Sequence, residues 1–262
     1  MSDKPAAGTP AEGAPTERQH KNDMYGDIRS RSEDDAGVQP PIPAATVVLL
    51  RDDEPGIEVL MLKKNSKITF GGMWVFPGGK IDAEDRTGDD DDVAAVNAAC
   101  RETEEETGLV LDGDVFKYFA HWTPPPGPQK RFTTWFFVAD VNAVDHHVEI
   151  DDGEIKDHDW LSPAQALARH GKGEIDLVPP TWVTLYHLSQ HPTVAAFMAH
   201  LEGRPVQRYS TRVVKAADGN RVAMWAGDAG YEAWDAEVSG PRHRLVMASG
   251  GFRFENDVLA YD

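Results

Sequence analysis

Three glutamates near the middle of the chain have the residue type and spacing that divalent-metal chemistry requires. Glu102, Glu105 and Glu106 stand at positions i, i+3 and i+4 of a segment with a helical pattern, so their carboxylates project from one face. Like charges at this spacing repel one another and destabilise a helix unless a counter-charge neutralises them. Mg²⁺ is suited to that purpose because it prefers carboxylate oxygens, waters and substrate phosphates as ligands. The alternative is a solvated acidic face, which is the commoner meaning of a charge run.

The residues around this helix favour the metal interpretation. The segment Phe76–Gly79 ends an apolar strand predicted at 73–76, and its two glycines permit a close approach of the backbone. The helix is predicted to begin near Asp92, and Gly108 supplies a C-terminal stop. A second side of the helix is expected to face the core; it holds Val93, Val96, Ala99, Cys100 and Thr103.

In this order the residues resemble the signature of the Nudix hydrolases, GX5EX7REUXEEXGU, in which U is an aliphatic residue. Gly79 corresponds to its first glycine, and Arg101–Leu109 corresponds to its second half, with Thr103 at one aliphatic position. The gap between Gly79 and Arg101 is about eight residues longer than the signature allows, so we expect no in-register counterpart of its isolated glutamate. The candidates to replace that glutamate are Glu84, Asp85 and the run Asp89 to Asp92.

The resemblance implies a metal site and a general base. Its cofactor would be Mg²⁺ (or Mn²⁺), bound by Glu102, Glu105, Glu106 and the backbone carbonyl of Gly79. The general base would be Glu105, Glu106 or Glu154, of which the last comes from an acidic loop before a short strand. Solvated loop acids are commoner than catalytic ones, so a plain surface position is the alternative for Glu154.

Several basic residues are candidates for contacts with acids or phosphates. Arg101 is assigned to a structural pair that orients a carboxylate, and it is expected to point away from the glutamates. Arg131 begins the strongest strand pattern, at 131–141, and is a candidate for substrate binding through a phosphate; the alternative is a pair with an acid. The basic segment Lys63–Lys67 leads toward the glycine turn, although a solvated position is favoured for each lysine taken alone.

Around these residues the sequence predicts an α/β fold, and the resemblance implies the Nudix α/β/α sandwich with a mixed sheet. Apolar and β-branched runs predict strands at 44–50, 57–62, 73–76, 115–122, 131–141 and 154–160. Further helices are predicted at 164–170, 180–188 and 192–201. Ser162 and Pro163 form a typical helix start before the first of them.

Composition divides the chain into three parts. Residues 1–42 are rich in Pro, Ala, Gly and acidic residues and are expected to form a disordered tail. The Nudix domain is assigned to 43–202, and a β-rich extension to 203–262, which opens with a hairpin at 206–225. The extension contains no catalytic pattern. Covering a sheet edge, forming a dimer contact and closing over the substrate all remain open for it.

Charge and composition exclude several classes of partner. The chain of 262 residues is 40% hydrophobic and carries a net charge of −18, with a pI near 4.9. Such a field repels bulk nucleic acid and anionic membranes but admits a phosphorylated small molecule whose charge is screened by metal ions. With the single cysteine Cys100 and no apolar run of about 20 residues, the chain is expected to be cytoplasmic. A homodimer is left open.

A finer resemblance concerns the substrate. The segments 70–85 (FGGMWVFPGGKIDAED) and 123–137 (TP…RF-T-FF), together with Pro179–Thr181, are similar to the coenzyme A diphosphatase-like subgroup. This similarity implies hydrolysis of the diphosphate linkage of a nucleoside diphosphate attached to another group, with coenzyme A or acyl-CoA as the first candidate. The alternatives are the same chemistry on NADH, ADP-ribose, a dinucleoside polyphosphate or a nucleotide sugar, and a non-catalytic ligand-sensing Nudix module. Three mutually repelling acids argue against the sensing module, because a pure binder has no need of them.

Overall fold

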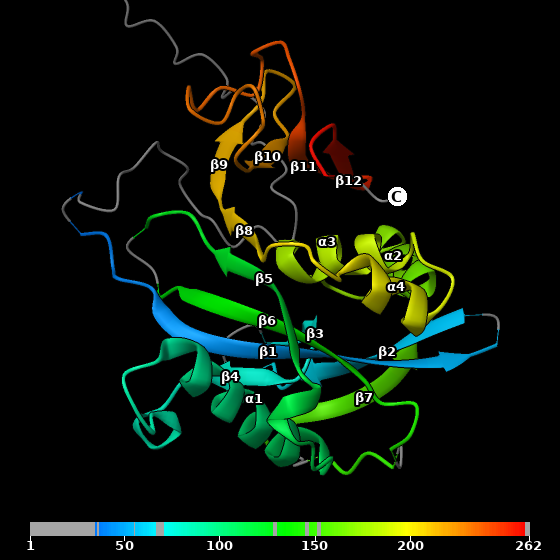
Figure 1. Ribbon diagram of the computed structural model, residues 1–262. Helices are drawn as coiled ribbons and strands as arrows, with labels where there is room; N and C mark the ends of the chain where they lie inside the picture. Colours follow the sequence, from blue (N-terminus) through cyan, green and yellow to red (C-terminus); the bar gives the residue numbers. More distant parts are fainter. Residues whose placement is uncertain are drawn as a thin grey trace, which may run out of the picture.

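The fold consists of a central sheet between helices and a second, smaller sheet (Figure 1). The computed structural model describes residues 35, 37–54, 56–66, 71–127, 130–144, 147–150 and 153–259. Most of the predicted disordered tail, and the Lys67 end of the basic segment, lie outside these residues. Within them the predicted α/β class, with a mixed sheet between helices, is confirmed.

The central sheet is mixed and eight-stranded. Its main order is β3-β2-β1-β6-β5-β8, with β4 paired to β1 and β7 paired to β2. The pairs β1–β6 and β5–β8 are parallel, whereas the other pairs are antiparallel. The strands are β1 (Ile42–Asp53), β2 (Gly56–Lys64), β3 (Trp74–Val75), β4 (Gly78–Lys80), β5 (Lys117–Thr123), β6 (Phe132–Asp140), β7 (Ile155–Leu161) and β8 (Gln207–Ser210).

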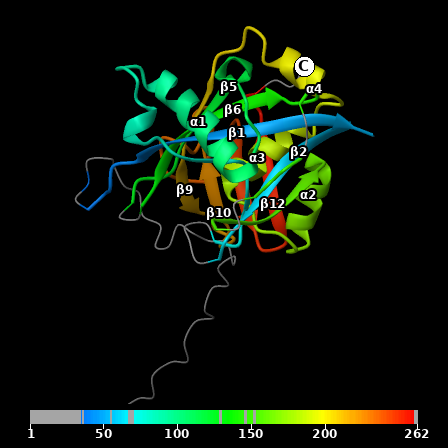
Figure 2. The ribbon, with the colours of Figure 1, turned by 90° about the horizontal axis from the view of Figure 1, so that it is seen from below.

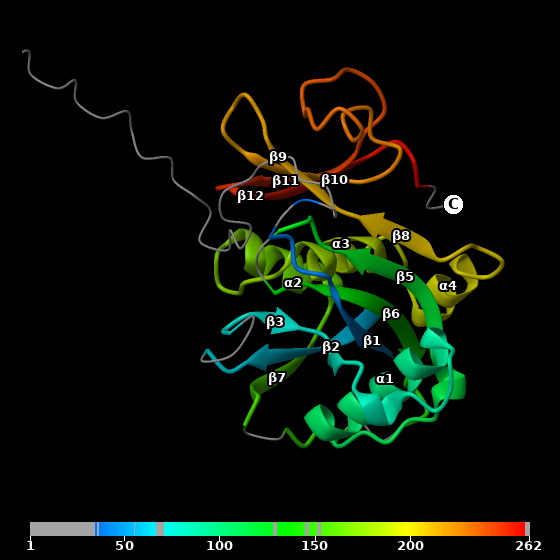
Figure 3. The same ribbon diagram turned by 90° about the vertical axis from the view of Figure 1, so that its left-hand side faces the viewer.

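Helices cover both faces of this sheet. The helix α1 lies alone on one face, next to β1 (Figure 2), and three helices lie together on the other face (Figure 3). The α-helices are α1 (Asp91–Thr107), α2 (Pro163–Gly171), α3 (Pro179–Leu188) and α4 (Val194–His200), and single turns of 3-10 helix occur at η1 (Ala83–Asp85) and η2 (Gly113–Val115). The capping box of Ser162 and Gln165 confirms the predicted start of α2.

The sequence of α1 explains both its ends and its packing. The Asp90 side chain accepts a hydrogen bond from the Asp92 amide at the start, and Gly108 ends the helix with a φ of 72°. The predicted apolar side was only partly right, because Val93 is 46% exposed. Small residues pack against the sheet instead, and these are Ala94, Ala95, Ala98, Ala99 and Thr103. Their short side chains let the helix backbone approach the sheet closely.

The C-terminal extension contributes to both sheets. After α4 the chain adds β8 to the central sheet, parallel to β5, and then forms a four-stranded antiparallel sheet in the order β12-β11-β10-β9. The strands of this second sheet are β9 (Arg212–Lys215), β10 (Arg221–Met224), β11 (His243–Ala248) and β12 (Gly251–Asn256). The predicted hairpin at 206–225 thus corresponds to β8, β9 and β10.

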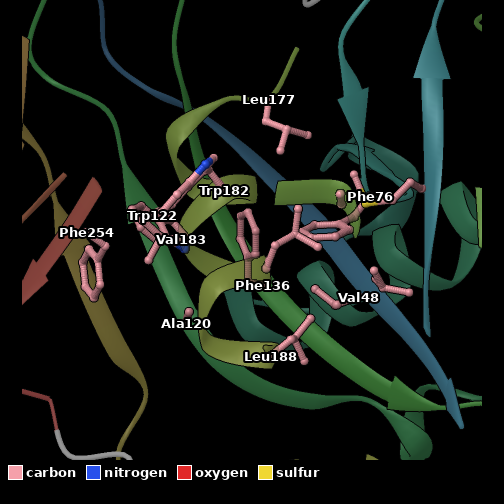
Figure 4. Close-up of a cluster of buried hydrophobic side chains, with 14 of the residues drawn as sticks. Val48, Phe76, Ala120, Trp122, Phe136, Leu177, Trp182, Val183, Leu188 and Phe254 are labelled. Atoms are coloured by element: carbon pink, nitrogen blue, oxygen red, sulfur yellow. The ribbon is translucent and has the colours of Figure 1, made fainter. Parts of the chain in front are cut away.

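One hydrophobic core joins the extension to the face of the central sheet that α2, α3 and α4 cover. Figure 4 shows Phe136 of β6, Trp182 of α3 and Phe254 of β12 within the same cluster. The rings of Trp122 and Tyr209 stack with their centroids 3.7 Å apart and their planes 2° apart. Burial of large aromatic surfaces is the main favourable contribution that such contacts make to folding.

Candidate active site

The C-terminal half of α1 places two carboxylates against the glycine turn. The Gly78 amide donates a hydrogen bond of 2.8 Å to Oε2 of Glu106. A Cβ atom added at Gly79 would lie only 2.1 Å from Oε1 of Glu102, so only glycine leaves room for that carboxylate. The turn and the helix therefore fit each other through these two glutamates.

Glu106 is the most buried acid of the three. Its side chain is 5% exposed, and in the part of the chain that the structure describes its Oε1 atom has no hydrogen-bond partner. Burial raises the pKa of Glu106 to about 7, although the charge of Lys64 and the Gly78 amide act in the opposite direction. A buried carboxylate oxygen without a partner is costly, and a hard cation would satisfy it.

Arg101 contacts the other two glutamates, which corrects the expectation that it points away from them. Its Nη1 atom donates to Oε1 of Glu102 at 3.0 Å and to Oε2 of Glu105 at 3.1 Å. Glu105 is 59% exposed, so its contact with Arg101 is weak. The same guanidinium also donates two hydrogen bonds to Asp85, from Nε at 3.0 Å and from Nη2 at 2.9 Å. Arg101 therefore does orient carboxylates, but it does so within the glutamate cluster.

Asp85 occupies the position of the isolated glutamate of the signature, which corrects the expectation that this glutamate has no in-register counterpart. It lies six residues after Gly79, which is the spacing that GX5E requires, so the additional residues lie after Asp85 and before Arg101. The residue is 4% exposed. Although burial opposes ionisation, hydrogen bonds from Arg101 hold the pKa of Asp85 below its usual range. Counting forward from the glycine would have selected Asp85 in the sequence.

The neighbouring aspartates have other functions. Asp90 caps α1, Asp91 pairs with Arg86 at 2.7 Å, and Asp92 accepts a hydrogen bond of 2.7 Å from the Trp135 indole. These contacts organise the start of the helix, at the opposite end from Glu106.

Lys64 brings the predicted base Glu154 to the site. The Lys64 Nζ atom lies 2.6 Å from Oε1 of Glu154 and 3.5 Å from Oε1 of Glu106. Glu154 is 53% exposed, and its backbone carbonyl accepts a hydrogen bond from the Asn65 amide. A solvated position was favoured for Lys64, yet its side chain is only 11% exposed. The alternation of side chains along the strand could have predicted this burial, because Lys64 lies on the same face of β2 as the buried residues Leu60 and Leu62.

Arg131 contacts backbone carbonyls, whereas the sequence predicted a role in phosphate binding. The residue is 6% exposed, and it donates hydrogen bonds to the backbone carbonyls of Gln39 and Pro124 at 2.8 and 3.0 Å. These bonds tie the chain before β1 to the loop after β5. Arg131 therefore has a structural function at the start of β6.

The chemistry of these groups fits a hard divalent cation. Oε1 of Glu106, which accepts no hydrogen bond within the described part of the chain, and the carboxylate of Glu102 against Gly79 are oxygen donors of the kind that Mg²⁺ prefers. Among the residues that the structure describes, no three acidic, histidine or cysteine side chains converge in a ready-made metal geometry. Arg101 and Lys64 hold the carboxylates in their present positions, so loading a cation requires these side chains to rearrange.

The mixed sheet between helices, with an acidic helix beside a glycine turn, is the arrangement that the resemblance to the Nudix hydrolases implied. The sequence profile described as NUDIX domain matches residues 40–180, which is more than half of the chain, so the chain belongs to the Nudix family. It is a Nudix-type pyrophosphohydrolase. The comparison with curated proteins gave no significant match.

Solved structures resemble this chain to different extents, and the first of them shows the same fold. A NUDIX hydrolase from Alicyclobacillus acidocaldarius is 25% identical, with a TM-score of 0.56 over 63% of this chain and 99% of its own. An Ap4A hydrolase from C. elegans in a binary complex is 23% identical, with a TM-score of 0.41 over 60% of this chain and 98% of its own. The NUDIX domain of Shewanella oneidensis NrtR, complexed with ADP ribose, is 17% identical, with a TM-score of 0.45 over 58% of this chain and 88% of its own. In the described ranges, none of the helices is long and apolar enough to cross a membrane.

Proposed function

We propose that the protein hydrolyses the diphosphate linkage of a nucleoside diphosphate attached to another group, with Mg²⁺ (or Mn²⁺) as cofactor and coenzyme A or acyl-CoA as the first candidate substrate. One observation supports the metal-dependent chemistry above all others. The buried carboxylate of Glu106 is fixed on one oxygen by the Gly78 amide, and its other oxygen has no hydrogen-bond partner among the residues that the structure describes. That second oxygen is the natural ligand for a divalent cation.

The proposed metal ligands are Glu102, Glu105, Glu106 and the backbone carbonyl of Gly79. When bound, a divalent cation supplies Lewis-acid chemistry, because it withdraws charge from phosphoryl oxygens and makes water more acidic. The Gly78 amide orients Glu106, and Arg101 orients Glu102 from the opposite side. Without Arg101 the mutual repulsion of these carboxylates would spread them apart.

The general base is proposed to be Glu105, Glu106 or Glu154. Each is a carboxylate on the side of α1 that carries the metal ligands or directly beside it. Glu154 contacts Lys64 and is 53% exposed, whereas Glu105 contacts Arg101 and is 59% exposed. A base in this position removes a proton from the attacking water, and the cleaved bridging oxygen leaves on the second phosphate.

The substrate proposal rests on sequence similarity. The segments 70–85 and 123–137 and Pro179–Thr181 carry the resemblance to the coenzyme A diphosphatase-like subgroup. Pro179 and Thr181 are buried in the first turn of α3. They therefore belong to the packing between this helix and the rest of the protein. NADH, ADP-ribose, dinucleoside polyphosphates and nucleotide sugars remain alternative substrates with the same chemistry, and ligand sensing remains the non-catalytic alternative. A cytoplasmic location and a homodimer also remain predictions.

A substrate panel tests this proposal. Coenzyme A, an acyl-CoA, NADH, ADP-ribose, a dinucleoside polyphosphate and a nucleotide sugar are each incubated with the full chain and Mg²⁺, and the products are identified by mass. We expect cleavage of the diphosphate linkage of coenzyme A and none in the Glu106→Gln variant. Faster cleavage of another member would reassign the substrate. Absence of any phosphate-bearing product would favour the sensing module.

A further inference from the structure

Lys64 is a cation that the fold itself places in the carboxylate cluster. We propose that it acts as an internal counter-ion, which competes with the divalent cation for Glu106 and withdraws together with Glu154 when that cation binds. The inference rests on the proposed function, since it takes Glu106 to be a metal ligand. It adds a residue outside the Nudix signature that sets how tightly the metal is held.

The backbone fixes the position of Lys64. It is the last residue of β2, its amide donates to the Met73 carbonyl at 3.0 Å, and its carbonyl accepts from the Gly72 amide at 2.9 Å. Because strand alternation directs its side chain toward the face covered by α1, the ammonium reaches the glutamates at the C-terminal half of that helix. The side chain is only 11% exposed, so its charge is weakly screened by solvent.

The two acids contact the ammonium in different ways. Oε1 of Glu154 lies at 2.6 Å and is a hydrogen-bond acceptor, whereas Oε1 of Glu106 lies at 3.5 Å and has no hydrogen-bond partner among the described residues. Lys64 thus forms a hydrogen-bonded ion pair with Glu154, whereas its interaction with Glu106 is an ion pair without a hydrogen bond. The Glu106 oxygen keeps its capacity to bind a ligand.

A divalent cation on that oxygen would lie within a few ångströms of the ammonium. Like charges at this separation repel strongly where solvent is scarce. Glu154 is half exposed, so the Lys64–Glu154 pair can relieve the repulsion by moving toward solvent. Metal binding therefore displaces an internal cation, which lowers the affinity for the metal and couples metal loading to the position of the candidate base.

The test measures binding of Mn²⁺ to the full chain by electron paramagnetic resonance, together with the thermal unfolding of the metal-free protein. We expect Lys64→Met to bind Mn²⁺ about tenfold more tightly than the unmodified protein, because one competing charge is removed. The same variant should unfold at a lower temperature without metal, because Glu106 and Glu154 then lose their counter-charge.

Lys63→Met is the matched control. It changes the net charge equally, but alternation places Lys63 on the opposite face of β2, so its Mn²⁺ affinity should stay within about twofold of the unmodified protein. Lys64→Arg should retain the weaker, competed binding, since it keeps the charge. If Lys64→Met fails to fold, Lys64→Gln carries the same expectation.

Equal or weaker Mn²⁺ binding by Lys64→Met would overturn the counter-ion proposal. The proposed function fails separately, through a Glu106→Gln variant that binds Mn²⁺ as tightly as the unmodified protein. The two results are independent, because the first compares affinities at an intact carboxylate cluster and the second removes a ligand from it.

Discussion

Arg101 holds Asp85 through two hydrogen bonds that span the additional residues between the glycine turn and α1, with Nε–Oδ1 and Nη2–Oδ2 distances of 3.0 and 2.9 Å. Such a two-point contact with a planar guanidinium fixes direction as well as distance. It keeps η1 against α1 although the loop between them is longer than the signature allows.

Replacing Asp85 by asparagine should destabilise the protein by about 1–3 kcal/mol, because Arg101 loses its hydrogen-bonded ion pair with a buried carboxylate while keeping Glu102 and Glu105 as counter-charges. Urea unfolding at pH 7 measures the change. The pKa of Asp85 is lowered in the folded protein, so its contribution is present above the pKa of the unfolded chain and disappears as the pH falls through the lower, folded value. Asp90→Asn is the control, since asparagine also caps a helix; an equal loss in both variants would refute the role of the pair.

Glu106→Gln should reduce the Mg²⁺-dependent rate by about a hundredfold or more, since a neutral amide is a poor ligand for a hard cation. Folding should be little affected, because the amide oxygen can still accept from Gly78. Initial rates and the Tm of each variant are the measurements. Glu104→Gln, at an exposed position of the same helix, should retain nearly full activity. Full turnover by the Glu106 variant would remove this residue from the site.

Gly79→Ala should weaken metal binding without unfolding the protein. The added methyl group would lie 2.1 Å from the Glu102 carboxylate, which must then move away from the turn. Mn²⁺ affinity and the far-UV circular dichroism spectrum test the two parts of this statement. Gly88→Ala is the control, because a Cβ there meets no atom of the described residues within 4 Å. An unchanged Mn²⁺ affinity in Gly79→Ala would show that the Glu102 carboxylate can move away from the turn without any effect on metal binding.

Acid should weaken the junction between α3 and the C-terminal sheet. Burial lowers the pKa of His187 to about 3 and also lowers the pKa of His243. Both rings stay neutral in the folded protein while the unfolded chain binds protons below its pKa near 6.5. Each histidine therefore removes about 1.4 kcal/mol of stability per pH unit as the pH falls below about 6.5, down to its own folded pKa.

Urea unfolding at pH 7.5 and 5.0 measures this acid sensitivity. His187→Gln should reduce the difference between the two pH values, because glutamine does not titrate and can still bond to Tyr209, the partner of His187 at 3.1 Å. His147→Gln should leave the difference unchanged, since the His147 side chain is 73% exposed. Identical pH dependence in the His187 variant would contradict the assignment.

Local patterns predicted the elements of the site well. The helix around Glu102, its glycine stop and the strands beside it follow from periodicity and from turn residues, which act over a few positions. The direction of Arg101 did not follow, because its partner Asp85 comes from a separate turn whose distance from α1 was altered by the additional residues. Arg131 was assigned to phosphate on the basis of its charge, whereas its burial against two carbonyls is visible only in the folded chain.

Long-range contacts explain the rest of what the sequence left open. Lys64 was favoured as a solvated residue because nothing nearby in sequence revealed that Glu154, ninety positions away, would be its partner. Likewise the function of the extension was left open. The stack of Trp122 on Tyr209 depends on the pairing of β8 with β5, which no local pattern indicates. Contacts of this kind depend on topology, which a single sequence indicates weakly.

The stack of Trp122 on Tyr209 has a consequence for any truncation of the chain to its Nudix domain. A product ending at residue 202 would lack Tyr209 and Trp225, and so would present Trp122 to water on a newly unpaired sheet edge. Such a fragment should be recovered from insoluble aggregates, whereas the whole chain should stay in the supernatant. We therefore expect the last strands to be required for recovery of the folded protein.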